Sequence, residues 1–545
     1  MLHSDTSGMR TLVVGLDGVC LSVLEPLFDD NELPALESLY ERSASGPLES
    51  QLPPWTPSAW PSLYTGKNPG KHGVYDFLHF DGYDWDVVNR SHVKATAVWE
   101  LLSMNGFESV VLNVPVTHPS PAFDGTLVPG YISPESPECH PESTLSELRD
   151  QLGEYRVYME NSGTNTSKAE RVNGYETLIG MRGAAFRYLV DDREPDFGFV
   201  QFQQCDTVFH EYPDDTETVR RVFRAIDTEL SKILETCDPD ITLIVSDHGI
   251  GPMEGKELRV NQFLREQGLV TTTAGDGGMP SWASLSRNQL RNGQKSESTP
   301  TPSPAERALE YAAAVGITSQ RIGTILQRLG LDDFVLEYVS QDIVRAGTER
   351  VDFADSTAYM RSRTEMGVRL NVAGREPDGV VDPDEYEAVR SDVMAALDSV
   401  ETPDGEPFFE QVVPREAVFD GPYLEDAPDI LTVPADFTHY LSASLRSERF
   451  AEPSEPWEHK RNGIVMVAGD EIDPDTDLTG SHLFDITPTI LATFGLGVGS
   501  EMDGTSLPVV PETGRTEYPA FEPEPAVETD ETAVEQRLAD LGYLE

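Results

Sequence analysis

Apolar runs alternate with amphipathic segments along the first half of the chain. Runs with the length of buried strands occur at residues 11–17, 108–115, 196–203 and 241–247. Helices are predicted around residues 33–43, 58–65, 168–191 and 216–237. In the last of these, Val219, Phe223 and Ile226 share one face, which indicates packing against a core. Strands that alternate with helices favour an α/β fold with a largely parallel sheet.

The second half is less regular. Residues 271–305 contain few large apolar side chains and many Ser, Thr, Gly and Pro residues, so they cannot bury enough area to offset the entropy of ordering, and a flexible loop is predicted. A strand at 463–469 and a helix at 485–495 follow later. The predicted divisions are 10–270 for the first part of the main domain, with a cap-like insertion at about 118–190; 271–305 for the flexible loop; 306–350 for a helical insertion; 351–505 for the remainder of the main domain; and 506–545 for an acidic tail with a short helix.

Side chains that can bind metal ions follow three of the predicted strands. Asp17 closes TLVVGLD, Asp206 follows FGFVQFQQC, and Asp247 and His248 close ITLIVSDH. In open α/β sheets, ligands bind outside the carboxyl ends of the strands. The sequence therefore predicts that these side chains converge on metal ions at one edge of the sheet.

Seven segments, spread over roughly residues 10 to 500, form an ordered series. They are VVGLDG, PPWTPSAWPSLYTGKNPGKHGVYDF, DTVFH, VSDHG, GREPDG, HKRNGIVMVAG and DITPTILATFG. In this order they resemble the alkaline phosphatase superfamily, within its phosphodiesterase/nucleotide-pyrophosphatase-like and phosphohydrolase/phosphomutase-like branch. The ordered series is specific where a single match would not be. The resemblance implies an α/β fold of the alkaline-phosphatase-like kind, a three-layer αβα sandwich with a mostly parallel central sheet and inserted cap segments.

The resemblance also implies two divalent metal ions. Asp206, His210 and His459 would hold one ion, and Asp206 and His210 share a face if a helical turn starts at Asp206. His482, in TGSHLFD, is the alternative to His459. The second ion would be held by Asp17, Thr56, Asp247 and His248. This mixture of imidazoles and carboxylates suits zinc best and also tolerates manganese or iron.

Thr56 is the predicted nucleophile. The ten residues from Thr56 to Gly66 match the interval of the family, whereas Ser58 and Ser62 do not. A divalent cation would lower the pKa of the hydroxyl, and in-line attack would give a phosphothreonine, with the two ions ~4 Å apart. A threonine that only caps the following helix is the simpler interpretation of this residue alone.

The substrate is less constrained by the sequence. Phosphodiesterases of the family place an Asn three residues after the nucleophile, and Ala59 stands there. Lys67 and Lys71 are candidates for substrate binding, and Arg375 is as well explained by a salt bridge. A small-molecule phosphate ester is the expected substrate of a phosphodiesterase or nucleotide pyrophosphatase. A phosphomutase with the same intermediate and a non-catalytic, cation-rich binding protein are the alternatives.

Acidic residues dominate the charge of the whole chain. The formal net charge is −55 and the sequence pI is about 4.3. An acid excess spread along the chain resembles the proteins of salt-accumulating halophiles, and it argues against a basic face for nucleic acid. The four cysteines form no CxxC pair, which indicates a reducing compartment. With no stretch of 18 apolar residues and no signal-like core, a cytoplasmic location without a membrane segment is expected, and the oligomeric state stays open.

Overall fold

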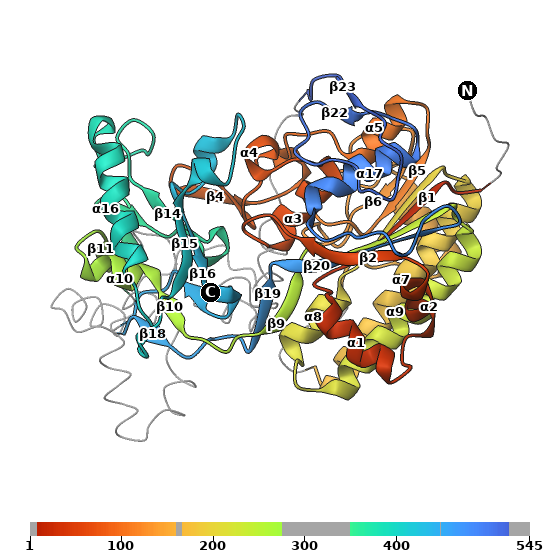
Figure 1. Ribbon diagram of the computed structural model, residues 1–545, viewed down its shortest axis with the longest axis horizontal. Helices are drawn as coiled ribbons and strands as arrows, with labels where there is room; N and C mark the ends of the chain where they lie inside the picture. Colours follow the sequence, from red (N-terminus) through yellow and green to blue (C-terminus); the bar gives the residue numbers. More distant parts are fainter. Residues whose placement is uncertain (1–7, 160–165, 275–348, 447, 523–545) are drawn as a thin grey trace, which may run out of the picture.

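An eight-stranded sheet runs through the larger of two bodies in the computed structural model (Figure 1), which describes residues 8–159, 166–274, 349–446 and 448–522. In spatial order its strands are β21 (Ser481–His482), β2 (Ala44–Glu49), β20 (Asn462–Gly469), β8 (Ile241–Val245), β1 (Thr11–Leu16), β7 (Phe197–Phe202), β5 (Ser109–Leu112) and β6 (Gly125–Val128). The five strands from β8 to β6 are parallel to one another, and β20 runs antiparallel to its two neighbours. The predicted α/β fold with a mostly parallel sheet is confirmed.

Both faces of this sheet are buried under helices. Successive residues of β1 alternate between the two cores, with Val13 on one side and Leu12 and Val14 on the other. One layer contains α3 (Thr56–Thr65), α5 (Val98–Met104) and α17 (Ile486–Thr493). The other contains α1 (Leu21–Asp29), α2 (Pro34–Glu41), α6 (Thr144–Leu152), α7 (Lys168–Arg193), α8 (Gln204–Glu211) and α9 (Thr216–Cys237). The result is the three-layer arrangement that the resemblance implied.

A smaller body, here called the cap, is formed by residues 257–274, 349–446 and 448–451 (Figure 1). Its main sheet has the order β13 (Ala358–Tyr359), β14 (Gly367–Leu370), β16 (Ile430–Pro434) and β15 (Phe409–Pro414). A second sheet joins β17 (Tyr440–Ser442), β10 (Glu257–Arg259) and β18 (Phe450–Ala451), and a third joins β11 (Thr271–Ala274) and β12 (Glu349–Asp352). With α10 (Val260–Glu266) and α16 (Tyr386–Asp398), these strands enclose a hydrophobic core of their own.

Short elements connect the two bodies and complete the chain. The hairpin of β3 (Leu78–Asp81) and β4 (Asp84–Val87) follows α4 (Pro69–His72), and β22 (Val498–Gly499) pairs with β23 (Arg515–Thr516). The ladder that matters most for the site is antiparallel and joins β9 (Gly249–Pro252) to β19 (Trp457–Lys460).

The cap differs in position from the cap-like insertion predicted at residues 118–190. That segment contributes β6 to the edge of the central sheet, and its helix α7 packs against β5, β7 and α9. This role is hard to predict from the sequence because the segment is rich in prolines and its one strand of the central sheet, β6, is only four residues long. Cap strands lie instead in the region 351–505 that was assigned to the main domain.

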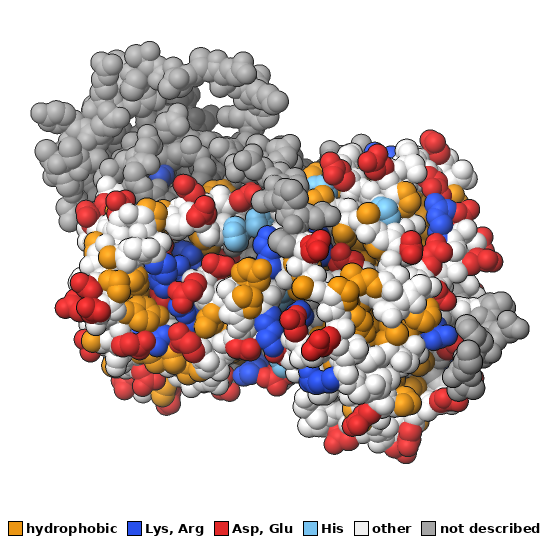
Figure 2. All heavy atoms as spheres, turned by 90° about the horizontal axis from the view of Figure 1, so that it is seen from above, with side chains coloured by type: hydrophobic (Ala, Val, Ile, Leu, Met, Phe, Trp, Pro, Cys, Tyr) orange, Lys and Arg blue, Asp and Glu red, His pale blue; other side chains and the backbone are white. Residues whose placement is uncertain are grey.

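Parts of the remaining predictions fall outside the described residues. Residues 271–274 of the predicted flexible loop form β11, and its remainder lies outside the described range, as does almost all of the helical insertion at 306–350. The terminal helix predicted within 506–545 also lies outside it. Within the described part, every helix is too short or too polar to span a bilayer. Figure 2 shows Asp and Glu side chains scattered over the described surface of one face, as expected from a net charge of −55.

Candidate active site

Three aspartates meet at the carboxyl ends of three neighbouring strands. β8, β1 and β7 are adjacent in the sheet, with β1 in the middle. Asp17 follows β1 directly, Asp247 comes two residues after β8, and Asp206 lies in the first turn of α8, just beyond β7. All three carboxylates are buried, with relative exposures of 0%, 0% and 2%. Sheet topology thus brings together residues that are up to 230 positions apart in sequence.

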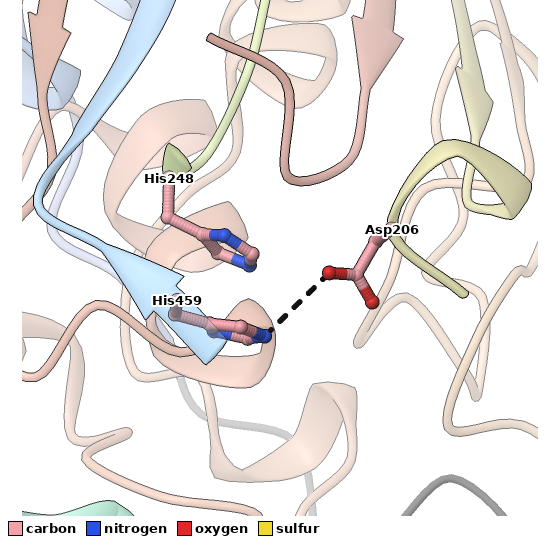
Figure 3. Close-up of side chains that lie close together, drawn as sticks. All are labelled: Asp206, His248 and His459. Atoms are coloured by element: carbon pink, nitrogen blue, oxygen red, sulfur yellow. Dashed lines mark ion pairs between the residues drawn. The ribbon is translucent and has the colours of Figure 1, made fainter. Parts of the chain in front are cut away.

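Three histidines lie close to these carboxylates, and they come from two parts of the fold. His248 follows Asp247, and the β9–β19 ladder pairs Ile250 with His459, so that the two imidazole rings stack with centroids 3.6 Å apart. His210 lies one turn after Asp206 on α8. Figure 3 shows the rings of His248 and His459 side by side, with the Asp206 carboxylate turned toward them.

These side chains form two adjoining donor sets. In the first, Nε2 of His210 lies 3.3 Å from Oδ1 of Asp206 and 3.3 Å from Nε2 of His459. The distance from Nε2 of His459 to Oδ1 of Asp206 is 3.6 Å. In the second, Nε2 of His248 lies 3.6 Å from Oδ1 of Asp17 and 3.3 Å from Oδ2 of Asp247. Two nitrogens bound to one tetrahedral zinc ion are about 3.3 Å apart, so both sets are close to metal-binding geometry.

The Thr56 hydroxyl lies against the second set. Its Oγ1 donates to Oδ1 of Asp17 at 3.4 Å and is 3.3 Å from Nε2 of His248. Thr56 is the first residue of α3, and no side chain caps that helix. The structure therefore places the hydroxyl in the cluster, whereas an N-cap hydroxyl would bond to the helix.

The two alternative hydroxyls of α3 point elsewhere. Ser58 Oγ donates to the carbonyl of Val74 at 3.0 Å, and Ser62 Oγ is 2.8 Å from Nε2 of His72. Both are therefore engaged in the packing of α3 and lie outside the two donor sets.

Hydrogen bonds from outside each set orient its members. His248 Nδ1 is 2.9 Å from the carbonyl of Gly249, and His459 Nδ1 is 2.9 Å from the carbonyl of Pro54. A carbonyl can only accept, so each ring carries its proton on Nδ1 and presents the Nε2 lone pair to the site. Oδ2 of Asp17 accepts from Gln201 Nε2 at 2.7 Å and from Trp60 Nε1 at 3.2 Å.

Gly18 makes the close approach of two strand ends possible. Its φ is +67°, and a Cβ at this position would lie 2.8 Å from Oδ1 of Asp206. Its amide also donates to Oδ1 of Asp247 at 3.3 Å. A side chain at Gly18 would push Asp206 and the start of α8 away from β1.

The electrostatics of the cluster fit divalent cations. Burial, followed by the charges of Asp247 and Asp206, raises the pKa of Asp17 well above its usual range, and burial raises the pKa of Asp247 to about 6. Oδ2 of Asp247 is fully buried and accepts no hydrogen bond. Burial and the neighbouring His248 and His210 lower the pKa of His459 well below its ordinary value. Although burial opposes it, the charge of Asp206 raises the pKa of His210 to about 9. Carboxylates held this close, next to imidazoles, are a donor set that a metal ion would satisfy.

The predicted substrate-binding lysines do not join the cluster. Lys67 Nζ lies 2.9 Å from a carboxylate oxygen of Glu501, and Lys71 forms ion pairs with Asp503 and, at 3.6 Å, with Asp420. Both ammonium groups therefore have a carboxylate partner in the C-terminal part of the larger body, and Lys71 has a second one in the cap. Their role in substrate binding stays a prediction.

Other candidates weighed from the sequence have structural surroundings. His482 lies on the edge strand β21, where its Nδ1 accepts from the amide of Phe484 at 3.2 Å, and it belongs to none of the metal-binding groups found among the described residues. The Arg375 guanidinium forms a salt bridge with Asp429, with Nη1 2.7 Å from Oδ1. His459, and not His482, therefore lies next to Asp206 and His210.

Sequence reasoning missed three residues that contact the site. Gln201 and Trp60 hold Asp17, and Glu458 lies next to the first donor set, with Oε1 4.0 Å from Nε2 of His210. Gln201 is a polar residue in the otherwise apolar run FGFVQF, and this is the one signal that could have singled it out. Trp60 and Glu458 have no comparable signal in the sequence.

Comparison with known proteins assigns the family. The family model of type I phosphodiesterases and nucleotide pyrophosphatases matches residues 11–313, more than half of the chain. The chain belongs to this family. It is therefore a member of the alkaline phosphatase superfamily and a hydrolase of phosphoric esters, and both expectations from the resemblance are confirmed. No curated protein matches the sequence.

Solved structures show the same fold at low identity. Phosphonoacetate hydrolase from Sinorhizobium meliloti 1021 superposes with a TM-score of 0.52 at 15% identity, over 88% of this chain and 94% of that one. The wild-type alkaline phosphatase PafA superposes with a TM-score of 0.52 at 12% identity, over 93% of this chain and 100% of that one. The alkaline-phosphatase-like architecture thus extends over both bodies of the structure.

Proposed function

We propose that this protein hydrolyses small phosphoric diesters through a phosphothreonine formed on Thr56. The observation that carries this proposal is the position of the Thr56 hydroxyl, 3.4 Å from Oδ1 of Asp17 and 3.3 Å from Nε2 of His248. The hydroxyl is thus held by two members of a donor set that suits a divalent cation. Phosphoryl transfer depends on such positioning together with the neutralisation of charge.

Two divalent cations would be held by the two donor sets. Asp206, His210 and His459 would bind one, and Asp17, Asp247, His248 and the Thr56 oxygen the other. Zinc fits the mixture of imidazoles and carboxylates best, and manganese or iron also suit it. When bound, the cations supply positive charge to the phosphoryl oxygens and lower the pKa of the threonine hydroxyl.

The chain's own groups prepare the attack. The hydrogen bond from Thr56 Oγ1 to Asp17 fixes the direction of the hydroxyl, and Gln201 and Trp60 fix Asp17 in turn. Oγ1 forms a bond to phosphorus while the bond to the leaving alcohol breaks. Water then cleaves the phosphothreonine, which releases a monoester and restores the hydroxyl. The sum is one diester and one water converted to one monoester and one alcohol.

The charges around Thr56 favour a diester, which carries one negative charge, over a monoester, which carries two near neutral pH. Lys67 and Lys71 are neutralised by carboxylates. A substrate with less charge makes smaller demands on such a site. The family match, which covers residues 11–313, supports the same substrate class.

The decisive experiment compares two chromogenic esters, bis-p-nitrophenyl phosphate and p-nitrophenyl phosphate, in molar KCl with added zinc or manganese. We expect the diester to be turned over faster and Thr56→Ala to lose at least ~10³-fold in kcat, because the covalent step is removed. Thr56→Ser keeps a hydroxyl and should retain part of the activity. Ser58→Ala is the matched control in the same helix and should remain within a few-fold of wild type. Full activity in Thr56→Ala would refute the proposal.

A further inference from the structure

A fourth acidic residue approaches the first donor set from the strand that carries His459. Glu458 is 3% exposed, and its Oε1 lies 3.7 Å from Nε2 of His459 and 4.0 Å from Nε2 of His210. His210 Nε2, Glu458 and His459 Nε2 form one of the groups of donor atoms close enough together to hold a metal ion. None of the site predictions included Glu458.

The two oxygens of this carboxylate have different surroundings. Oε2 accepts from Nη1 of Arg363 at 2.8 Å. Oε1 is turned toward the two imidazoles and accepts from the amide of its own neighbour, His459, at 3.1 Å. A carboxylate with one oxygen held by a guanidinium and the other directed at imidazole nitrogens is arranged as metal ligands usually are, with an outer partner that fixes the ligand.

Arg363 belongs to the cap and reaches across to the site. It opens a short 3₁₀ turn, η2 (Arg363–Glu365), and its guanidinium carbon lies 4.7 Å from the ring centre of Tyr440 and 5.3 Å from that of Trp55. Trp55 directly precedes Thr56, and its ring lies 4.4 Å from that of His459. Arg363 is 5% exposed, so this cation is held in the interface between the cap and the metal-binding residues.

We propose that Glu458 is a ligand of the ion bound by Asp206, His210 and His459, and that Arg363 holds it in the liganding orientation. This inference rests on the proposed function, since it concerns one of the two ions. The two imidazole nitrogens are already 3.3 Å apart, the spacing for a common ion. Oε1 lies 3.7 and 4.0 Å from them, so it would need to approach by less than ~1 Å to join them. Zinc sites expand to five ligands, so a phosphoryl oxygen still finds a place.

The consequence is that the cap takes part in metal binding. Without Glu458 the first ion has one carboxylate and two imidazoles, and with it two of each. The added negative charge tightens binding of a dication, and the cap supplies the arginine that keeps this carboxylate from turning away.

The test is calorimetric titration of zinc into the full-length protein, stripped with a chelator, in molar KCl. Wild type should bind two ions. Glu458→Gln should weaken one of them ~100-fold and leave the other unchanged, as expected when a ligand is lost. The amide oxygen can still accept from Arg363, so the contact with the cap is kept. Arg363→Gln leaves the carboxylate in place and should weaken the same ion by ~10-fold.

Cobalt provides a second readout. The visible absorption of the cobalt-loaded protein reports the ligands of the ion and should change in Glu458→Gln and be largely preserved in Arg363→Gln. Glu458→Asp, which keeps a carboxylate on a shorter stem, should lie between wild type and Glu458→Gln in affinity.

Two results would overturn the inference. One is that Glu458→Gln binds both ions as wild type does. The other is that Arg363→Gln loses more affinity than Glu458→Gln, which keeps the contact with Arg363. The pair would then only fasten the cap. Failure of the proposed function looks different, because wild type would then bind fewer than two ions or Thr56→Ala would stay active. Suppose that wild type binds two ions, that Thr56→Ala is inactive and that Glu458→Gln binds zinc as wild type does. This combination contradicts the role of Glu458 and leaves the proposed function intact.

Discussion

Replacing Asp247 by asparagine should stabilise the metal-free protein while destroying one metal site. The side chain is fully buried between β8 and β1, and its Oδ2 has no hydrogen-bond donor. In Asp247→Asn, the amide oxygen can keep the hydrogen bond from Gly18, and the NH₂ group would lie near Nε2 of His248, 3.3 Å from the present Oδ2. The variant removes a buried negative charge and supplies a donor in its place.

The size of the effect follows from the pKa of this carboxyl. Burial raises the pKa of Asp247 from its ordinary 3.8 to about 6. An acid with a higher pKa in the folded state holds its proton better when folded, so its ionisation costs stability as the pH rises from about 4 to about 6. The raised pKa corresponds to a destabilisation of the metal-free protein on the order of a few kcal/mol at pH 7. Asp247→Asn should therefore unfold at higher urea than wild type at pH 7 and at the same urea near pH 4.

Asp429→Asn is the matched control with the opposite sign. Although burial opposes it, the hydrogen bond and charge of Arg375 lower the pKa of Asp429 to about 2. This carboxylate contributes stability above about pH 4 that is lost as the pH falls toward 2. Its replacement should cost about 2 kcal/mol at pH 7 from the pKa difference alone.

Both variants and wild type would be unfolded in urea, in molar KCl with EDTA, from pH 4 to 8, and followed by circular dichroism. Excess zinc should reverse the order of wild type and Asp247→Asn, because a ligand at 1,000 times its Kd stabilises the folded state by ~4 kcal/mol. If Asp247→Asn is no more stable than wild type at pH 7 in EDTA, burial of the ionised Asp247 carboxylate does not carry the cost argued above.

Three further predictions follow from the same contacts and charges. Gln201→Leu removes the 2.7 Å hydrogen bond to Asp17 and should weaken one ion ~10- to 100-fold in a zinc titration, with unchanged binding contradicting a supporting role. His459→Gln should lose tight binding of the other ion, whereas His482→Gln should bind both ions as wild type does; the reverse result would reassign the ligand. A net charge of −55 should make activity and unfolding temperature rise from low salt to molar KCl, and a flat response would contradict the halophilic interpretation.

Elements with a strong local pattern could be predicted from the sequence almost to the residue. The amphipathic segment 216–237 is helix α9 (Thr216–Cys237), and the apolar runs 11–17 and 241–247 are β1 (Thr11–Leu16) and β8 (Ile241–Val245). These elements have apolar residues in a regular period or an unbroken run, because one or both faces are buried. The short strands of the cap have two to six residues each, too few to show a period, so the cap was predicted in the wrong segment.

The residues of the candidate site also differ in whether a local sequence pattern could reveal them. Asp17, Asp206 and Asp247 could be found because each follows an apolar strand, and strand ends of a parallel sheet meet at one edge. His459 could be placed only through the resemblance, since its position depends on the ladder between β9 and β19, which joins residues more than 200 positions apart. Periodicity and spacing carry no information about such a pairing.

Glu458 shows why a residue next to a predicted ligand can be missed in the sequence. In sequence it is one of 95 acids, in the stretch EPSEPWEH, and its charge is indistinguishable from that of its exposed neighbours. Its burial depends on the β9–β19 ladder, which turns β19 against α8, and on the cap, which brings Arg363 to its outer oxygen. A buried carboxylate needs a cation, and here one oxygen has an arginine while the other faces two imidazoles. A metal ion between Oε1 and these imidazoles would give the second oxygen a cation as well, and this is the physical basis of the proposed role of Glu458.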